Sequence, residues 1–237
     1  MKIELIIMTF AILVAVGKPV SATWSPGKNE IGPDQDTYIS VGGVLGNPDA
    51  NYGGAENLYI GDSLDGISVS ALRFDLSDKG PFSKLEFKAD ITVFDSATRK
   101  IFVNVIPNVI WNELEVTGID NPFNATDLAF ADENDPIVYQ SITVTQTTDE
   151  IVFSITDFLE NATSLTIVLA QEFGSDGWVT MSAKENQYLT AFSNPPHLEY
   201  SVKSASGTQT QSETASATFI LGFAITSVIF SRKRKAI

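Results

Sequence analysis

The sequence predicts an all-β fold: an antiparallel β-sandwich of jelly-roll type, followed by one C-terminal transmembrane helix. Short segments in which apolar and polar residues alternate recur along the chain, and turn residues such as Asn47-Pro48-Asp49 separate them. The 237 residues suffice for one large β domain with its own core. We therefore expect a single sandwich between targeting segments, without internal repeats.

The strands are predicted from this alternation. Every second residue from Leu85 to Val93 is apolar, and charged residues or threonine lie between them. Such a pattern gives a strand one apolar and one polar face, as in antiparallel sheets with one face in water. Strands are expected at 71–76, 85–93, 101–106, 141–145, 151–155, 165–169, 178–182 and 197–202. The only helix expected within the domain is one or two turns after Thr156, in TDFLENA.

Residues 1–22 are typical of an export signal. Lys2 precedes an apolar run from Leu5 to Gly17, and Val20-Ser21-Ala22 supplies the small residues that signal peptidase requires. We predict cleavage after Ala22, so that residues 23–35 form a short lead-in to the domain. The alternative is a retained anchor, but ~13 apolar residues extend only ~20 Å as a helix, less than the ~30 Å of a bilayer core.

The C-terminal segment predicts a membrane anchor. The Ser/Thr-rich stretch 204–216 has almost no large apolar side chain, so we expect a flexible stalk. No charge occurs between Glu213 and Arg232, and a helix at 217–231, or starting at 214, would span up to ~27 Å. The basic tail 232–237 should stay cytoplasmic and leave the domain outside. A sorting tail that is cut off and replaced by a lipid or wall link is the alternative.

The domain is strongly acidic and lacks cysteine. The chain carries a formal charge of −14, and the segments outside 23–216 hold six of its 15 basic but one of its 29 acidic residues, which leaves −19 for the exterior. Nucleic acid is therefore not an expected partner, since phosphate binding requires positive charge. Without cysteine, no disulfide can stabilise the exported domain.

Three stretches near the start of the domain resemble a known family. They are DTYIS at 36–40, NYGGAENLYIG at 51–61 and SALRFDLSD at 70–78. Their order is similar to the opening of the DNRLRE-type domain, also classed as carbohydrate-binding module family 96 and related to disaggregatase repeats. The resemblance implies an ordered loop that lies against the sandwich and leads into a core strand.

The likeness extends to about Lys203. Similar to later elements of the family are IWNELEVTG at 110–118, IVFSITDFL at 151–159, SLTIVLA at 164–170, MSAKEN at 181–186 and NPPHLEYSV at 194–202. Two positions depart from it: Asn194 stands where the family usually has Arg, and Ile119 or a neighbour stands where a second Trp is common. The resemblance implies a non-catalytic carbohydrate-binding domain over 36–203.

Sugar recognition usually requires an aromatic face and fixed polar groups, because a pyranose ring has an apolar face and a rim of hydroxyls. The aromatic candidates are Tyr38, Tyr52, Tyr59, Trp111, Trp178 and Tyr188, and the polar ones are Asn51, Arg73, Lys184 and Glu185. Core or loop packing is the alternative for each aromatic side chain, and we favour it for Trp111 and Trp178. Tyr52 lies in the predicted loop and has the best prospect of exposure.

Calcium is the one metal that the sequence suggests, and no cofactor is required. Loop-like segments that can supply oxygen ligands contain Asp34, Asp36, Asp62 and Asp65, although no EF-hand spacing is present. Solvated loop acids are the alternative. Asn124 and Asn161 begin glycosylation sequons and are expected at the surface.

An enzyme is not expected. His197, the only histidine, has no nucleophile-elbow motif to complete a Ser-His-Asp triad, so we expect a structural histidine at the surface. Paired carboxylates for glycoside cleavage cannot be identified from spacing alone.

The leading hypothesis is a cell-surface protein that binds an extracellular glycan and holds it near the membrane. The resemblance allows acidic polysaccharides such as alginate as ligands. The charge of the domain would repel a polyanion unless cations bridge the two, so a neutral glycan is the easier partner. The alternative hypothesis is a structural or adhesive protein of the cell envelope, which binds other proteins or itself through sheet edges.

Overall fold

The structure, a computed structural model, describes residues 26–42, 47–63, 66–93, 97–155, 162–175, 177–184 and 194–203. All of these belong to the compact unit 1–203. The predicted export signal, stalk, transmembrane segment and basic tail lie outside the described residues, as does the helix predicted after Thr156. Within the described ranges, no helix has the length and apolar character needed to cross a bilayer.

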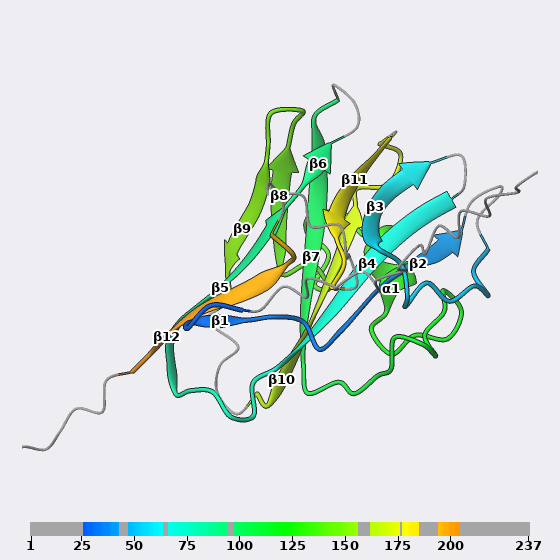
Figure 1. Ribbon diagram of the computed structural model, residues 1–237. Helices are drawn as coiled ribbons and strands as arrows, with labels where there is room; N and C mark the ends of the chain where they lie inside the picture. The colour runs from blue at the N-terminus through cyan, green and yellow to red at the C-terminus, as the bar shows by residue number, and fades with distance from the viewer. Residues whose placement is uncertain are drawn as a thin grey trace, which may run out of the picture. The chain divides into compact units, whose positions relative to one another are not determined.

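Two antiparallel sheets form the domain (Figure 1). The small sheet has the order β1 (Glu30–Ile31), β12 (His197–Val202), β5 (Phe82–Asp90), β9 (Glu150–Ser154). The large sheet has the order β6 (Thr92–Val93), β11 (Gly177–Ser182), β3 (Asn57–Ser63), β4 (Gly66–Asp75), β10 (Ser164–Gln171), β7 (Arg99–Pro107), β8 (Gln140–Val144), and β2 (Gln35–Gly42) also pairs with β4. The all-β antiparallel prediction is confirmed, and every predicted strand overlaps an observed one.

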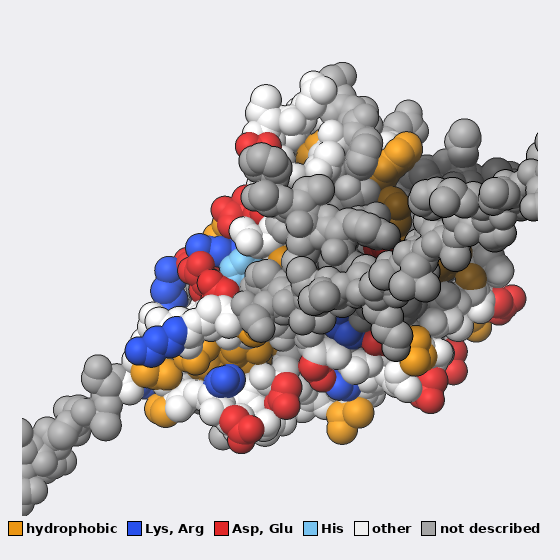
Figure 2. Space-filling view, in the orientation of Figure 1, with side chains coloured by type: hydrophobic (Ala, Val, Ile, Leu, Met, Phe, Trp, Pro, Cys, Tyr) orange, Lys and Arg blue, Asp and Glu red, His pale blue; other side chains and the backbone are white. Residues whose placement is uncertain are grey.

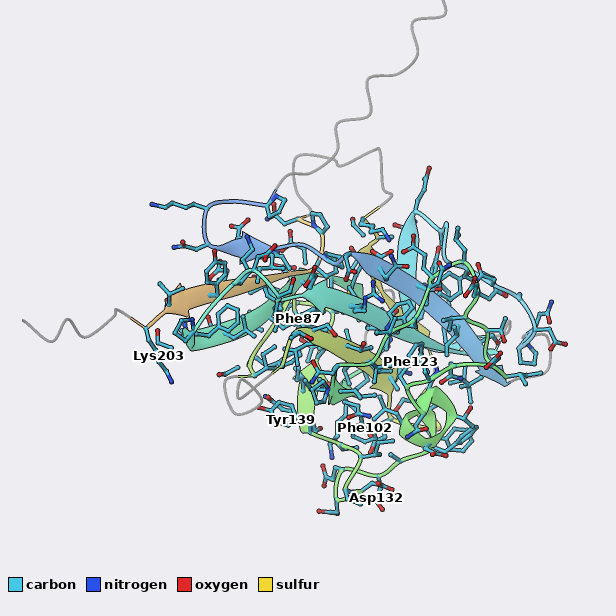
Figure 3. All side chains as sticks on the ribbon, turned by 90° about the horizontal axis from the view of Figure 1, so that it is seen from below. Phe87, Phe102, Phe123, Asp132, Tyr139 and Lys203 are labelled. Atoms are coloured by element: carbon cyan, nitrogen blue, oxygen red, sulfur yellow. The ribbon has the colours of Figure 1, made fainter. Side chains whose placement is uncertain are left out.

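The two sheets share an apolar core between them. Phe87 of β5 is labelled in Figure 3. Its ring packs against Phe74 of β4, at 6.2 Å between centroids, and against Phe153 of β9, at 4.9 Å. Leu85 and Ala89 point the same way as Phe87, because alternate residues of a strand face the same side. Burying one such large side chain contributes ~1.5–3 kcal/mol. Core burial thus holds together a domain that has no disulfide.

A second core lies on the opposite face of the large sheet. Residues 108–138, here called the covering segment, pack on that face and include the short helix α1 (Ala125–Ala129). Phe102 of β7 and Phe123 of the covering segment both belong to this second core (Figure 3). The prediction of one wet face per strand is therefore wrong for β4 and β10, which are buried on both sides.

The helix α1 is a further difference from the sequence-based prediction. Its Ala125, Leu128 and Ala129 are buried, at the i, i+3 and i+4 spacing that puts side chains on one helical face. Asn124 at its N-cap adopts φ 52° and makes no side-chain cap bond, while Asn121 Oδ1 accepts a hydrogen bond from the Ala125 amide at 3.1 Å. The helix thus depends on its neighbours in the covering segment for its start.

Candidate functional site

Three tyrosines from separate segments form an aromatic group, here called the tyrosine cluster: Tyr38 of β2, Tyr52 of the loop before β3, and Tyr59 of β3. Tyr38 and Tyr52 stack with their centroids 4.2 Å apart and 20° between the ring planes, and Tyr59 meets Tyr38 edge-on at 5.0 Å. All three side chains are half-buried. Because the rings fix one another's orientation, the cluster is a pre-ordered aromatic surface of the kind on which a pyranose ring packs.

The loop that carries Tyr52 is anchored to the covering segment. Asn51 Nδ2 donates to the carbonyl oxygens of Glu113, at 2.6 Å, and of Val116, at 2.7 Å, and its Oδ1 accepts from the Gly53 amide at 3.1 Å. A side chain on Gly53 would lie within 3.0 Å of the Glu113 carbonyl, so only glycine permits this close approach. The Asn-Tyr-Gly stretch is thus a structural device that holds Tyr52 in place.

Trp178 lies on the same face of the β3–β11 pair as Tyr59. The register sets Trp178 opposite Gly61 and Thr180 opposite Tyr59, and opposed residues of antiparallel strands share a face. Trp178 is 37% exposed, so the favoured prediction of core packing is wrong for this tryptophan. Diagonal neighbours on such a pair are about 7 Å apart, which lets Trp178 extend the aromatic surface beside Tyr59.

Trp111 has the opposite outcome. It is 6% exposed, meets Phe123 edge-on at 5.3 Å, and donates from Nε1 to Thr166 Oγ1 at 3.0 Å. Core packing was the alternative for Trp111, and the structure supports it. As a candidate for stacking on a ligand, Trp111 is therefore corrected to a core residue that joins the covering segment to β10.

Arg73 and Asp34 form an ion pair beside this tryptophan. Arg73 Nε donates to Asp34 Oδ2 at 3.0 Å, and Arg73 Nη1 donates to the Trp111 carbonyl at 2.7 Å. The side chains of Arg73 and Asp34 are 17% and 34% exposed. Arg73 therefore fixes the covering segment to β4, and its guanidinium is largely committed to protein partners.

Lys184 joins the same ionic network. Its amide donates to Asp36 Oδ2 at 2.7 Å, and its Nζ donates to the Asp34 carbonyl at 3.2 Å and forms an ion pair with Glu113. Because Asp36 and Tyr38 are two residues apart on β2, they share a face of that strand. The ionic network therefore adjoins the tyrosine cluster. Glu113 was not among the sequence-predicted site residues.

The predicted calcium ligands that the structure describes, Asp34 and Asp36, do not support a calcium site. The Asp34 carboxylate accepts from Arg73, and Asp36, which is buried, accepts from the Lys184 amide. A calcium site needs six to eight oxygen ligands directed at one point, and a guanidinium beside the carboxylate opposes that arrangement. Asp65 and the Asp62 side chain lie outside the described residues, as do Tyr188, Glu185 and Asn161.

An exposed pair of phenylalanines was missed by the sequence-based prediction. Phe130, just after α1, and Phe173, between β10 and β11, lie 5.0 Å apart between centroids and are both exposed. An open hollow of about 640 Å³ lies beside Phe130, and its lining includes Asn124, Asp127 and Asp135. Asn124 is exposed, as expected for its sequon. No periodic pattern in the sequence marks these two phenylalanines as exposed neighbours, so the sequence did not reveal the pair.

Comparison with known families decides between a general β-sandwich and a ligand-binding module. The sequence model of carbohydrate-binding module family 96 matches residues 28–193. The chain belongs to carbohydrate-binding module family 96. No curated protein matches this module significantly. The CBM22-1 xylan-binding domain from Paenibacillus barcinonensis Xyn10C is similar at 10% identity and a TM-score of 0.30, over 73% of this module's chain and 98% of that one.

The family match assigns carbohydrate binding to the region that holds both aromatic groups. The tyrosine cluster, the ionic network and the Phe130–Phe173 pair all lie within 28–193. Carbohydrate-binding module families are generally non-catalytic. The stretch NPPHLEYSV, on which the resemblance also rested, lies beyond the matched range. The tyrosine cluster and the Phe130–Phe173 pair are therefore the two candidate surfaces for the sugar in this family 96 module.

Proposed function

We propose that this module binds a polysaccharide on the tyrosine cluster, with Trp178 extending the aromatic surface. The observation that carries the proposal is the stacked pair of Tyr38 and Tyr52, held by a loop that is anchored through Asn51 and Gly53. A fixed ring surface loses little conformational entropy when a sugar packs on it, and that loss is a main cost of binding. The adjoining Lys184 can supply a donor to sugar hydroxyls.

A neutral glycan suits this surface better than an acidic one. The ionic network holds three carboxylates, those of Asp34, Asp36 and Glu113, against two cations, Arg73 and Lys184. These cations are paired within the protein, and the chain as a whole is acidic. A polyanionic sugar would therefore meet no unpaired positive charge among these residues and would be repelled at long range.

We also propose a location and a mode of action, which rest on the sequence alone. The module binds its glycan without cleaving it, outside the cell, and residues 217–231 anchor it in the membrane while residues 204–216 act as a spacer. Membrane fractionation with carbonate extraction tests the anchor, and cleavage by protease added to intact cells tests the orientation. Recovery of the chain in the soluble fraction, or protection from the protease, would contradict this part.

The binding test uses the full-length chain, purified in mild detergent, on an array of neutral and acidic glycans, followed by calorimetry on the best ligand. Tyr52→Ala should weaken binding roughly 2- to 10-fold, since an aromatic stacking contact contributes ~0.5–1.5 kcal/mol. Trp178→Ala should act in the same direction. Denaturation curves of each variant separate a lost contact from a lost fold.

The matched control is Phe173→Ala, because Phe173 is exposed and lies outside the tyrosine cluster. Binding that is weakened by Tyr52→Ala and unchanged in Phe173→Ala supports the proposed surface. The reverse result would move the site to the Phe130–Phe173 pair. Silence across the array would refute glycan binding as stated and would favour the alternative of a structural or adhesive protein.

A further inference from the structure

The outer face of the small sheet contains a group of metal-ligand side chains that the sugar site does not use. Glu30 of β1 pairs with Glu199 of β12, and His197 lies two residues before Glu199 on the same strand. Opposed residues share a face, and so do residues two apart on one strand. One ligand atom from each of the three residues lies within 4.8 Å of the other two. Figure 2 shows the histidine beside acidic and basic side chains.

The imidazole of His197 is fixed in the manner of a metal ligand. It is 8% exposed, so the prediction of a surface histidine is wrong. Its Nδ1 lies 2.9 Å from the Pro195 carbonyl oxygen, which requires the hydrogen to be on Nδ1. Nε2 is therefore the ring nitrogen that would bind a metal, and a backbone carbonyl is among the usual partners of the other ring nitrogen in ligating histidines.

Each glutamate can direct an oxygen to the same point. Glu30 accepts from the Gly27 amide through Oε2 at 2.7 Å, and Glu199 pairs with Lys88 through Oε1 at 2.9 Å, so each has a second oxygen.

The surrounding hollow is polar and net negative. It has a volume of about 170 Å³, and besides the three ligands it is lined by Lys88, Glu150 and Asn194. Three glutamates thus face one lysine and the imidazole, a balance that favours a cation. An ion with bonds of about 2.1 Å holds tetrahedral ligands roughly 3.4 Å apart, a distance that small rotations of the glutamates can reach from the observed spacing.

We propose that Glu30, His197 and Glu199 bind a divalent transition-metal ion of the Zn²⁺ class. One imidazole nitrogen with two carboxylates is a ligand set for Zn²⁺, and three protein ligands leave a fourth position for water. Ca²⁺ and Mg²⁺ are excluded as preferred ions because they take oxygen ligands. The ion would join the two-residue strand β1 to β12, a metal cross-link in a chain that has no cysteine.

The single histidine makes the test direct. The full-length chain, made without a polyhistidine tag and labelled with ¹⁵N, should show one imidazole whose Nε2 resonance shifts when Zn²⁺ alone is added. Calorimetry should give one Zn²⁺ per chain, and Mg²⁺ should give no binding. Zn²⁺ should also slow proteolysis near residues 26–31, because β1 is then held at two points.

Three variants locate the ligands. Glu30→Gln and Glu199→Gln should each weaken Zn²⁺ binding at least 10-fold, and His197→Asn, which keeps an N–H for the Pro195 carbonyl, should abolish it. Glu86→Gln is the matched control, since Glu86 lies opposite Glu199 on β5 but pairs with Lys84. If His197→Asn does not fold, the two Gln variants still decide the question.

The proposal is overturned if the wild-type chain binds no Zn²⁺, if the imidazole resonance does not respond, or if Glu86→Gln weakens binding as much as Glu30→Gln. The first of these results would make His197 an ion-pair partner of the glutamates only. Glycan binding is measured separately on the tyrosine cluster, so failure of the metal site leaves the proposed function intact.

Discussion

Gly53→Ala should loosen the loop that presents Tyr52. The added methyl group would lie within 3.0 Å of the Glu113 carbonyl oxygen, so the loop and the covering segment must separate. Separation endangers the two hydrogen bonds from Asn51 to the Glu113 and Val116 carbonyls. At ~0.5–1.5 kcal/mol each, their loss lowers the free energy of unfolding by about 1–3 kcal/mol.

Differential scanning fluorimetry and urea denaturation measure this loss. A domain of this size loses roughly 2–4 °C in Tm per kcal/mol, so the expected decrease is roughly 2–12 °C. The control is Gly54→Ala, because a side chain on Gly54 meets nothing within 4 Å. That variant should be neutral or slightly stabilising, since alanine restricts the unfolded chain.

Glycan affinity provides a second readout of Gly53→Ala. Displacement of Tyr52 removes its stacking on Tyr38, so affinity should fall about as much as in Tyr52→Ala, while Gly54→Ala should bind normally. Equal stability and equal affinity of the two glycine variants would refute the reasoning, because it would mean that the close approach of the loop to Glu113 has no energetic role.

Three further variants test the interior and the surface. Trp111→Phe should lower the free energy of unfolding by about 1–3 kcal/mol, because the buried Thr166 hydroxyl loses its indole partner. Urea denaturation measures this loss. Adding Thr166→Val to the same chain should recover part of the lost stability. Arg73→Met should lower the free energy of unfolding by ~1–2 kcal/mol, because the Asp34 carboxylate loses its ion-pair partner. In 1 M salt the difference in stability from wild type should shrink, and an unchanged difference would argue against an electrostatic origin. A hydrogen bond from the Ser77 backbone amide holds the pKa of Asp75 below its ordinary value of 3.8. The ionised carboxylate therefore adds to the free energy of unfolding above that pH, and this stabilisation is lost as the pH falls through the pKa of the folded state. Asp75→Asn should therefore destabilise by less than ~1 kcal/mol at pH 7 and not at all in strong acid, which denaturation across a pH series would show.

The strands were the predictable part of this fold. The alternation from Leu85 to Val93 gave β5 and β6, because a strand with one buried face must repeat every second residue. The uninterrupted apolar run IVLA at the end of SLTIVLA in β10 indicated a strand buried on both faces, and the prediction of one wet face overlooked it. The five-residue helix α1 is too short for helical periodicity to reveal it.

The site was predictable in its residue types but not in its geometry. Tyr52 was expected to be the most exposed of the aromatic candidates, but nothing in the sequence spacing reveals that Tyr38 stacks on Tyr52. The two tryptophans could not be separated from the sequence, because burial of Trp111 depends on a covering segment whose position is set by tertiary contacts. Glu30 and His197 are far apart in the chain, and only the pairing of β1 with β12 brings them together.

The position of β12 in the small sheet has a consequence for how the chain is made. β12 lies between β1 and β5, although it is the last strand of the domain and β1 is the first. During synthesis from the N-terminus, β1 has no neighbour in the small sheet, and one edge of β5 exposes unpaired backbone groups until residues 197–202 emerge. Contacts between such distant segments form slowly. Chains that end before His197 should therefore associate through the open edge of β5. The complete domain should not associate through this edge, because β12 covers it.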